Sequence, residues 1–104
     1  MAEWVPAAKT VDVREGLPIS VVLNGYEICL LRYQDRFYAI DDICTHAEAS
    51  LSEGEQQGKI IECPRHGGQF NIETGEAVHY PAFAPVQTYP VKVEGDTIQV
   101  AIES

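Results

Sequence analysis

Cys44-Thr45-His46 and Cys63-Pro64-Arg65-His66 decide how the rest of this sequence is interpreted. Sixteen residues separate the two stretches, and each stretch supplies one cysteine and one histidine. A structural zinc site usually takes a Cys-x-x-Cys pair from one loop and its other ligands from elsewhere. Two matched Cys–His pairs instead suit a two-iron cluster, in which one iron binds both sulfurs and the other binds both imidazoles. The sequence therefore predicts four ligands: Cys44, His46, Cys63 and His66.

The residues around these ligands extend the pattern. The Cys-x-His pair followed by Cys63-Pro64-Arg65-His66-Gly67-Gly68 resembles the signature of Rieske proteins. The wider sequence, with Asp42, Leu51-Ser52-Glu53-Gly54 and Thr88-Tyr89-Pro90-Val91-Lys92-Val93, resembles the small ferredoxins of bacterial aromatic-ring-hydroxylating dioxygenase systems. This resemblance covers nearly the whole chain. It implies one Rieske [2Fe–2S] cluster and two partners, a flavin-containing ferredoxin reductase and a terminal oxygenase.

The hydrophobic pattern predicts an all-β chain, because apolar residues recur in short strand-like runs and no segment has a helical period. Asn24-Gly25 is the strongest hairpin signal. Strands are expected at Lys9–Val13, Ile19–Leu23, Tyr26–Tyr33, Phe37–Ile40, Lys59–Glu62, Gln69–Ile72, Glu76–His79, Gln87–Val93 and Thr97–Ile102. Trp4–Ala8 is expected to be a lead-in whose tryptophan caps the core, and Ser52–Gly58 a polar loop.

A chain of 104 residues is expected to form one domain. The strand pattern predicts an antiparallel sandwich formed by residues 1–40 and 85–104. Residues 41–84, which contain both ligand stretches, are expected to form a smaller inserted cluster-binding subdomain. The resemblance to Rieske ferredoxins implies the same arrangement.

The composition limits the partners. Sixteen acidic and seven basic residues give a formal net charge of −9, which disfavours nucleic acid and anionic membranes. The charge keeps the protein soluble, and it also suits steering toward basic patches on redox partners. Met1-Ala2-Glu3-Trp4 does not resemble a signal peptide, and no run approaches the roughly 20 apolar residues of a membrane span. We therefore expect a cytoplasmic monomer.

Several residues outside the ligand set have competing interpretations. Cys29 lies in an apolar run and is expected to be a buried core thiol. His79 is expected to be a surface or hydrogen-bonded residue. The acidic run Glu53–Glu55 is either a solvated loop or a partner site. Tyr80, Pro81 and Phe83 either fill the core or, as the resemblance implies, belong to a loop that packs over the cluster, with Pro81 as a shield.

The resemblance also predicts a low midpoint potential. High-potential Rieske proteins brace their ligand loops with a disulfide and donate hydroxyl hydrogen bonds to the cluster sulfurs. Aligned on the motif, the disulfide positions are Ala49 and Arg65, and the hydroxyl positions are Gly68 and Phe70. Because neither the disulfide nor the hydroxyl donors can form, backbone N–H groups remain to stabilise the reduced state.

These features predict a one-electron carrier without a catalytic site. An oxygenase would need a second iron held by two histidines and a carboxylate, and only His79 remains outside the ligand set. Two alternatives stay open. The chain could be the small Rieske-like accessory subunit of an enzyme such as nitrite reductase, or a zinc-binding interaction module.

Overall fold

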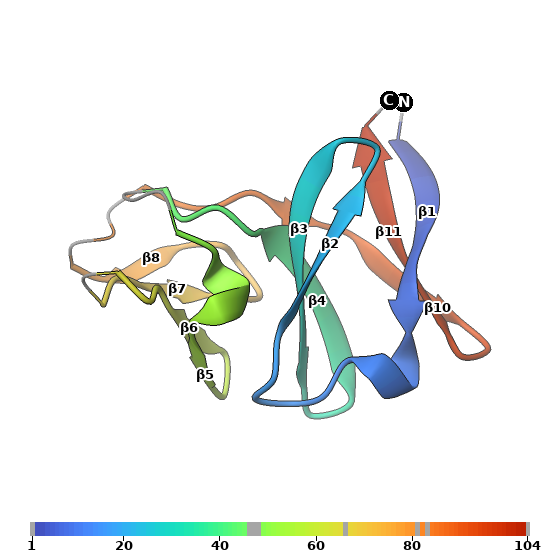
Figure 1. Cartoon of the computed structure of the whole chain (residues 1–104). Coiled ribbons are helices and arrows are strands. Elements are labelled where there is room, and N and C mark those ends of the chain that lie inside the picture. The colour runs from blue at the N-terminus through green and yellow to red at the C-terminus, as the bar shows by residue number, and fades with distance from the viewer. Residues whose placement is uncertain (1, 46–48, 66, 81, 83, 104) are drawn as a thin grey trace.

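The computed structural model describes residues 2–45, 49–65, 67–80, 82 and 84–103. Within these residues the chain forms strands joined by turns, with two short 3-10 helices (Figure 1). The strands are β1 (Ala2–Lys9), β2 (Ile19–Leu23), β3 (Tyr26–Tyr33), β4 (Arg36–Asp41), β5 (Glu55–Gln57), β6 (Ile60–Glu62), β7 (Gln69–Asn71), β8 (Ala77–His79), β9 (Thr88–Tyr89), β10 (Val91–Glu94) and β11 (Thr97–Glu103), and the helices are η1 (Thr10–Asp12) and η2 (Leu51–Glu53). The paired strands run antiparallel, so the predicted all-β fold is confirmed.

Two sheets form a sandwich, with strand orders β1-β11-β10 and β2-β3-β4-β9. The first strand pairs with the last, so the two ends of the chain lie side by side (Figure 1). Ile28 and Leu30 of β3 and Ile98 and Val100 of β11 are at most 1% exposed and belong to the buried cluster between the sheets. Burying one such side chain contributes about 1.5–3 kcal/mol, so this core is a main source of the sandwich's stability.

Strand β3 is buried on both of its faces. Ile28 and Leu30 belong to the sandwich core, whereas Cys29 and Leu31 belong to a second buried cluster that includes Ile61 of β6. Successive side chains of a strand point to opposite faces, so the middle sheet separates two cores. This explains why β3 contains a continuous apolar run where a half-exposed strand would alternate.

The third sheet, ordered β5-β6-β7-β8, lies on the side of the middle sheet away from β1 and β11 (Figure 1). Each of its strands has 3 residues. Ile61 and Phe70, paired across β6 and β7, are 0% exposed and face the second core. The ladder places Glu55, Glu62, Gln69 and His79 in one row across the sheet.

Most of the predicted strands are present, and the hairpin at Asn24-Gly25 is confirmed. These residues have φ angles of 51° and 87°, as a two-residue hairpin turn with both central residues left-handed requires. The part of the chain that the structure describes contains no helix long and apolar enough to cross a membrane.

The predictions for the first segment are wrong. Trp4–Ala8 lies within β1, and Thr10–Asp12 is a 3-10 helix where a strand was expected. Pro6 has no backbone N–H, but β1 is an edge strand, where a residue without this donor can be placed without losing a hydrogen bond between strands. Trp4 does not cap the core: it is 42% exposed, and the Lys92 Nζ lies 4.6 Å from its ring centroid.

Two later predictions are also wrong. The expected polar loop Ser52–Gly58 begins with the last two residues of η2 and contains the edge strand β5, whose middle residue Gln56 is buried. The single strand expected at Gln87–Val93 is divided at Pro90, so that β9 pairs with β4 and β10 pairs with β11. A proline lacks the N–H that a ladder needs, which explains the division.

Candidate metal centre

The first ligand loop leaves β4 and returns to η2. Ile43 pairs with Ser50, and the Cys44 N–H donates to the Ala49 carbonyl oxygen at 2.9 Å. The Leu51 N–H donates to the carbonyl oxygen of Asp42 at 2.6 Å. The two arms of the loop therefore lie side by side, with Cys44 on the first arm.

The second ligand loop joins β6 to β7 and closes on itself. The Cys63 N–H donates to the Gly68 carbonyl oxygen at 2.7 Å. The Arg65 N–H donates to the Cys63 Sγ at 3.5 Å. Gly67 has a φ of 73°, a left-handed conformation that glycine adopts without steric cost. The positive φ explains why a glycine occupies this turn.

The fold brings the two predicted cysteine ligands together. Cys44 and Cys63 are 4% and 1% exposed and belong to the same buried cluster as Phe70. Next to the two loops, the backbone at Gly54, after η2, approaches the end of β6 so closely that an added Cβ atom would overlap the Glu62 carbonyl oxygen. A residue with a side chain cannot occupy this position without a backbone shift, which explains the glycine.

These cysteines fit the thiolate pair of a two-iron cluster. Both are shielded from water, and the Arg65 N–H points at one sulfur, as hydrogen bonds that tune such sulfurs do. The other two predicted ligands, His46 and His66, lie outside the described residues. Among the residues that are described, no three His, Cys, Asp or Glu side chains gather as they would around a metal ion. Two thiolates with two imidazoles are the donor set of a Rieske cluster.

Cys29 is 0% exposed, which confirms the predicted core thiol. Burial raises the pKa of this thiol far above its usual range, and the Asp42 carboxylate adds to the shift. Cys29 belongs to the same buried cluster as Cys44 and Cys63, but it lies on β3, outside both ligand loops.

The segment after β8 packs partly against this centre. The Thr45 hydroxyl donates to the Ala84 carbonyl oxygen at 2.8 Å, and Ala82 belongs to the buried cluster. Tyr80 is 81% exposed, so the core-filling interpretation is wrong for this residue. Pro81 and Phe83, for which core filling or shielding was predicted, lie outside the described residues.

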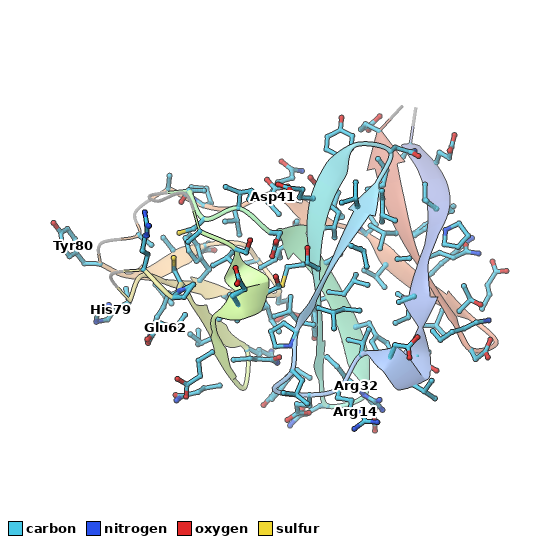
Figure 2. The ribbon with its side chains drawn as sticks, viewed as in Figure 1. Arg14, Arg32, Asp41, Glu62, His79 and Tyr80 are labelled. Atoms are coloured by element: carbon cyan, nitrogen blue, oxygen red, sulfur yellow. The ribbon has the colours of Figure 1, made fainter. Side chains whose placement is uncertain are left out.

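Polar side chains occupy the outer surface of the third sheet. His79 is exposed and its Nδ1 lies 2.6 Å from the Tyr80 carbonyl oxygen, as expected of a hydrogen-bonded surface histidine. The Gln69 Nε2 donates to Glu62 Oε1 at 2.8 Å. Figure 2 shows Glu62, His79 and Tyr80 at the same end of the molecule. Glu53 and Glu55 are exposed, as both a solvated loop and a partner site require, and Glu55 belongs to β5.

Sequence reasoning missed the role of Asp42. This residue is 2% exposed, and its carboxylate accepts hydrogen bonds from the Ser52 N–H at 2.9 Å and the Ser20 hydroxyl at 3.2 Å. The available signal was its position: a carboxylate that follows an apolar strand and precedes a predicted ligand by two residues.

Comparison with known proteins assigns the chain to a family. The model of the Rieske [2Fe-2S] domain matches residues 3–90. The chain is 40% identical over 100 residues to the ferredoxin component of the naphthalene 1,2-dioxygenase/salicylate 5-hydroxylase systems of Ralstonia sp., with 96% of each protein covered. Its structure is similar to that of the Sphingomonas yanoikuyae B1 ferredoxin, with a TM-score of 0.93, 32% identity, and 97% of this chain and 100% of that chain covered.

Two further solved structures share the fold. A ferredoxin solved in complex with the oxygenase of carbazole 1,9a-dioxygenase has a TM-score of 0.89 and 38% identity, over 94% of this chain and 92% of that chain. A nitrite reductase small subunit from Mycobacterium tuberculosis shares the fold, with a TM-score of 0.86 and 23% identity over 100% and 98% of the two chains. The family match and the ferredoxin relatives identify the chain as a member of the family of Rieske [2Fe–2S] domains.

Proposed function

We propose that this protein is a one-electron carrier that takes electrons from a flavin reductase and passes them to a terminal aromatic-ring dioxygenase. The observation that carries the proposal is the convergence of two ligand loops, each with a buried cysteine, at one end of a Rieske fold. Relatives that match nearly the whole chain are ferredoxin components of dioxygenase systems. One structural relative was solved bound to an oxygenase.

In this proposal Cys44 and Cys63 hold one iron, and His46 and His66 hold the other. The bound cluster supplies reversible one-electron transfer. The chain buries the two cysteines, and the Arg65 N–H donates to the Cys63 sulfur. A donor aimed at a ligand sulfur favours the more negative, reduced state.

The same residues support a low midpoint potential. Gly68 and Phe70 stand where the resemblance places hydroxyl donors in high-potential Rieske proteins, and neither has a hydroxyl. Ala49 and Arg65 stand at the disulfide positions. Backbone donors alone leave the reduced state less stabilised, so the potential lies at the low end of the Rieske range of roughly −150 to +300 mV.

Charge supports the role of a carrier that meets its partners by diffusion. Residues 41–84 contain eight acidic and two basic residues, and the rest of the chain contains eight acidic and five basic residues. The part of the sequence that contains the ligand loops therefore has most of the net negative charge, which can steer basic partner surfaces toward the cluster. At the same end of the molecule, Tyr80 is 81% exposed (Figure 2) and can anchor a partner that has docked.

The carrier acts as a monomer in the cytoplasm in this proposal. The sequence has three cysteines, and the proposal assigns two of them to the cluster, so no disulfide framework can form, which suits a reducing compartment. The chain itself performs no oxygenation, because His79 alone remains to hold a second iron.

Anaerobic stopped-flow spectroscopy tests the proposal. Chemically reduced protein is mixed with the oxidised terminal oxygenase of its source organism, and the transfer of one electron per cluster is expected. The second-order rate should fall as salt rises, because exposed charges are screened beyond about 8 Å at physiological ionic strength. A reduced protein that passes no electron to the oxygenase, but does pass one to a nitrite reductase, would assign it to the accessory-subunit alternative.

A further inference from the structure

We infer that Asp42 is the positioning residue of the first ligand loop, because its buried carboxylate fastens that loop to the sandwich. The inference rests on the proposed function, since it takes Cys44 as a cluster ligand. It goes further by naming the contact that sets where this ligand stands.

Asp42 connects three parts of the chain. Its Oδ2 accepts a hydrogen bond from the Ser20 hydroxyl of β2 at 3.2 Å, and its Oδ1 accepts one from the Ser52 N–H of η2 at 2.9 Å. Its own N–H donates to the Glu27 carbonyl oxygen of β3 at 3.0 Å, and its carbonyl oxygen accepts from the Leu51 N–H at 2.6 Å. One residue therefore fixes both arms of the loop to the middle sheet.

Burying the Asp42 carboxylate lowers the stability of the fold, so the residue needs a reason other than stability. Asp42 is 2% exposed, and its two side-chain partners, a hydroxyl and a backbone N–H, are uncharged. A buried carboxylate with neutral partners is less stable than a well-packed apolar side chain of similar size. A general contribution to stability therefore does not explain the residue, whereas the precise placement of a ligand two residues away does.

The two ligand loops differ in whether an extra contact is needed to hold them in place. The second loop closes through the Cys63 N–H and the Gly68 carbonyl oxygen, within one hairpin. The first loop is paired internally by the Cys44 N–H and the Ala49 carbonyl oxygen, but this bond does not fix the loop against the sandwich. Leu51, on the second arm, packs in the buried cluster with Leu31 and Ile40 of the middle sheet, and the bonds of Asp42 add the directional attachment that fixes where the loop stands.

Three variants and a matched control separate this role from general stability. Asp42→Ala removes both side-chain bonds, and Ser20→Ala removes the bond to β2 alone. Asp42→Asn keeps an oxygen for the Ser52 N–H and an amide that can donate to the Ser20 oxygen. The control is Asp41→Asn, because Asp41 is the adjacent carboxylate and accepts instead from the Tyr89 hydroxyl at 2.5 Å.

Three measurements are made on each purified holoprotein: the EPR spectrum after dithionite reduction, the rate at which an iron chelator bleaches the visible absorption, and the unfolding temperature. Asp42→Ala should shift or broaden the EPR signal and bleach more than about tenfold faster, since bonds to a carboxylate are among the stronger ones. Ser20→Ala should bleach about fivefold faster. Asp42→Asn should keep the wild-type EPR spectrum and bleach within about twofold of the wild-type rate, as should Asp41→Asn.

Different failures have different meanings. If Asp42→Ala does not fold, the pair Ser20→Ala and Asp42→Asn decides the question. Wild-type bleaching and EPR in Ser20→Ala, or an Asp42→Asn protein as perturbed as Asp42→Ala, would overturn the inference. A lower unfolding temperature with an unchanged EPR spectrum would do the same, because it would reduce Asp42 to a structural residue. A wild-type protein that shows no Rieske signal would overturn the proposed function and, with it, this inference.

Discussion

The sandwich and the third sheet with its ligand loops obtain their order in different ways. β3 has 8 residues and β11 has 7, and their side chains are buried in extended cores. The strands of the third sheet have 3 residues each, at the short end of the range for globular proteins. That sheet depends on its packing against the middle sheet and on single contacts at Gly54 and Asp42. The sandwich is therefore stabilised by the burial of many side chains, whereas the ligand loops depend on a few specific residues.

The two regions should differ most in how cysteine substitutions affect iron binding. Cys44→Ser, Cys63→Ser, His46→Ala and His66→Ala should each lose the cluster or its normal spectrum, because each removes a ligand with no substitute. Cys29→Ala is the control in the sandwich, and it should keep its full iron content because Cys29 lies on β3, outside both ligand loops. Iron analysis and EPR of the purified variants check this. Iron loss in Cys29→Ala together with a normal spectrum in Cys44→Ser would show that the ligand assignment is wrong.

Gly54 tests whether the third sheet depends on one close contact. Gly54→Ala should lower the free energy of unfolding by about 3 kcal/mol, because the new Cβ would stand 1.9 Å from the Glu62 carbonyl oxygen. Gly16→Ala is the control: its φ is 85°, but nothing lies within 4 Å of the added atom. It should cost about 1 kcal/mol through backbone strain alone. Denaturant unfolding measures both, and equal losses would remove the special role of the contact.

The pattern of the sequence predicted the two regions unequally. Tyr26–Tyr33 and Thr97–Ile102 were predicted as strands because burial imposes an apolar pattern on a long strand. β5 was missed because Glu55–Gln57 is polar throughout, and β1 because Pro6 and two alanines do not look like a strand. The ligand residues were predicted from chemistry and spacing alone. Asp42 was not, since no local pattern records a hydrogen bond to Ser20, which lies 22 residues away in the chain.

Tyr80 tests whether the exposed surface near the ligand loops, and not that of the sandwich, binds the partner. Tyr80→Ser should weaken the complex with the terminal oxygenase about thirtyfold, or about 2 kcal/mol, because an exposed aromatic beside the cluster is a strong candidate for a binding hot spot. Val11→Ser is the control, because Val11 is 72% exposed but lies in η1, beside the sandwich. It should leave the affinity within about twofold. Calorimetric titration gives both values, and the midpoint potential of both variants should stay unchanged. Equal affinities for the two variants would place docking elsewhere on the surface.

The smallest expected effect is a change in the midpoint potential of the cluster. Phe70→Tyr introduces a hydroxyl at the position where high-potential Rieske proteins carry one, and it should raise the midpoint by roughly 40 mV, the equivalent of about 1 kcal/mol for one electron. Phe37→Tyr in the sandwich should leave the midpoint where it is. Protein-film voltammetry of both variants is the measurement. A lowered or unchanged midpoint in an intact Phe70→Tyr protein would remove hydrogen bonding as the reason for a low potential.

The central claim is that two cysteines and two histidines from the two loops hold one Rieske cluster. Electron-nuclear double resonance of the dithionite-reduced protein tests it most directly, because it detects nitrogen atoms bonded to the reduced iron. We expect an EPR signal from one reduced [2Fe–2S] cluster per chain, with couplings from two imidazole nitrogens that change when His46 or His66 is replaced. A colourless protein that binds zinc, or a reduced cluster without nitrogen couplings, would contradict it.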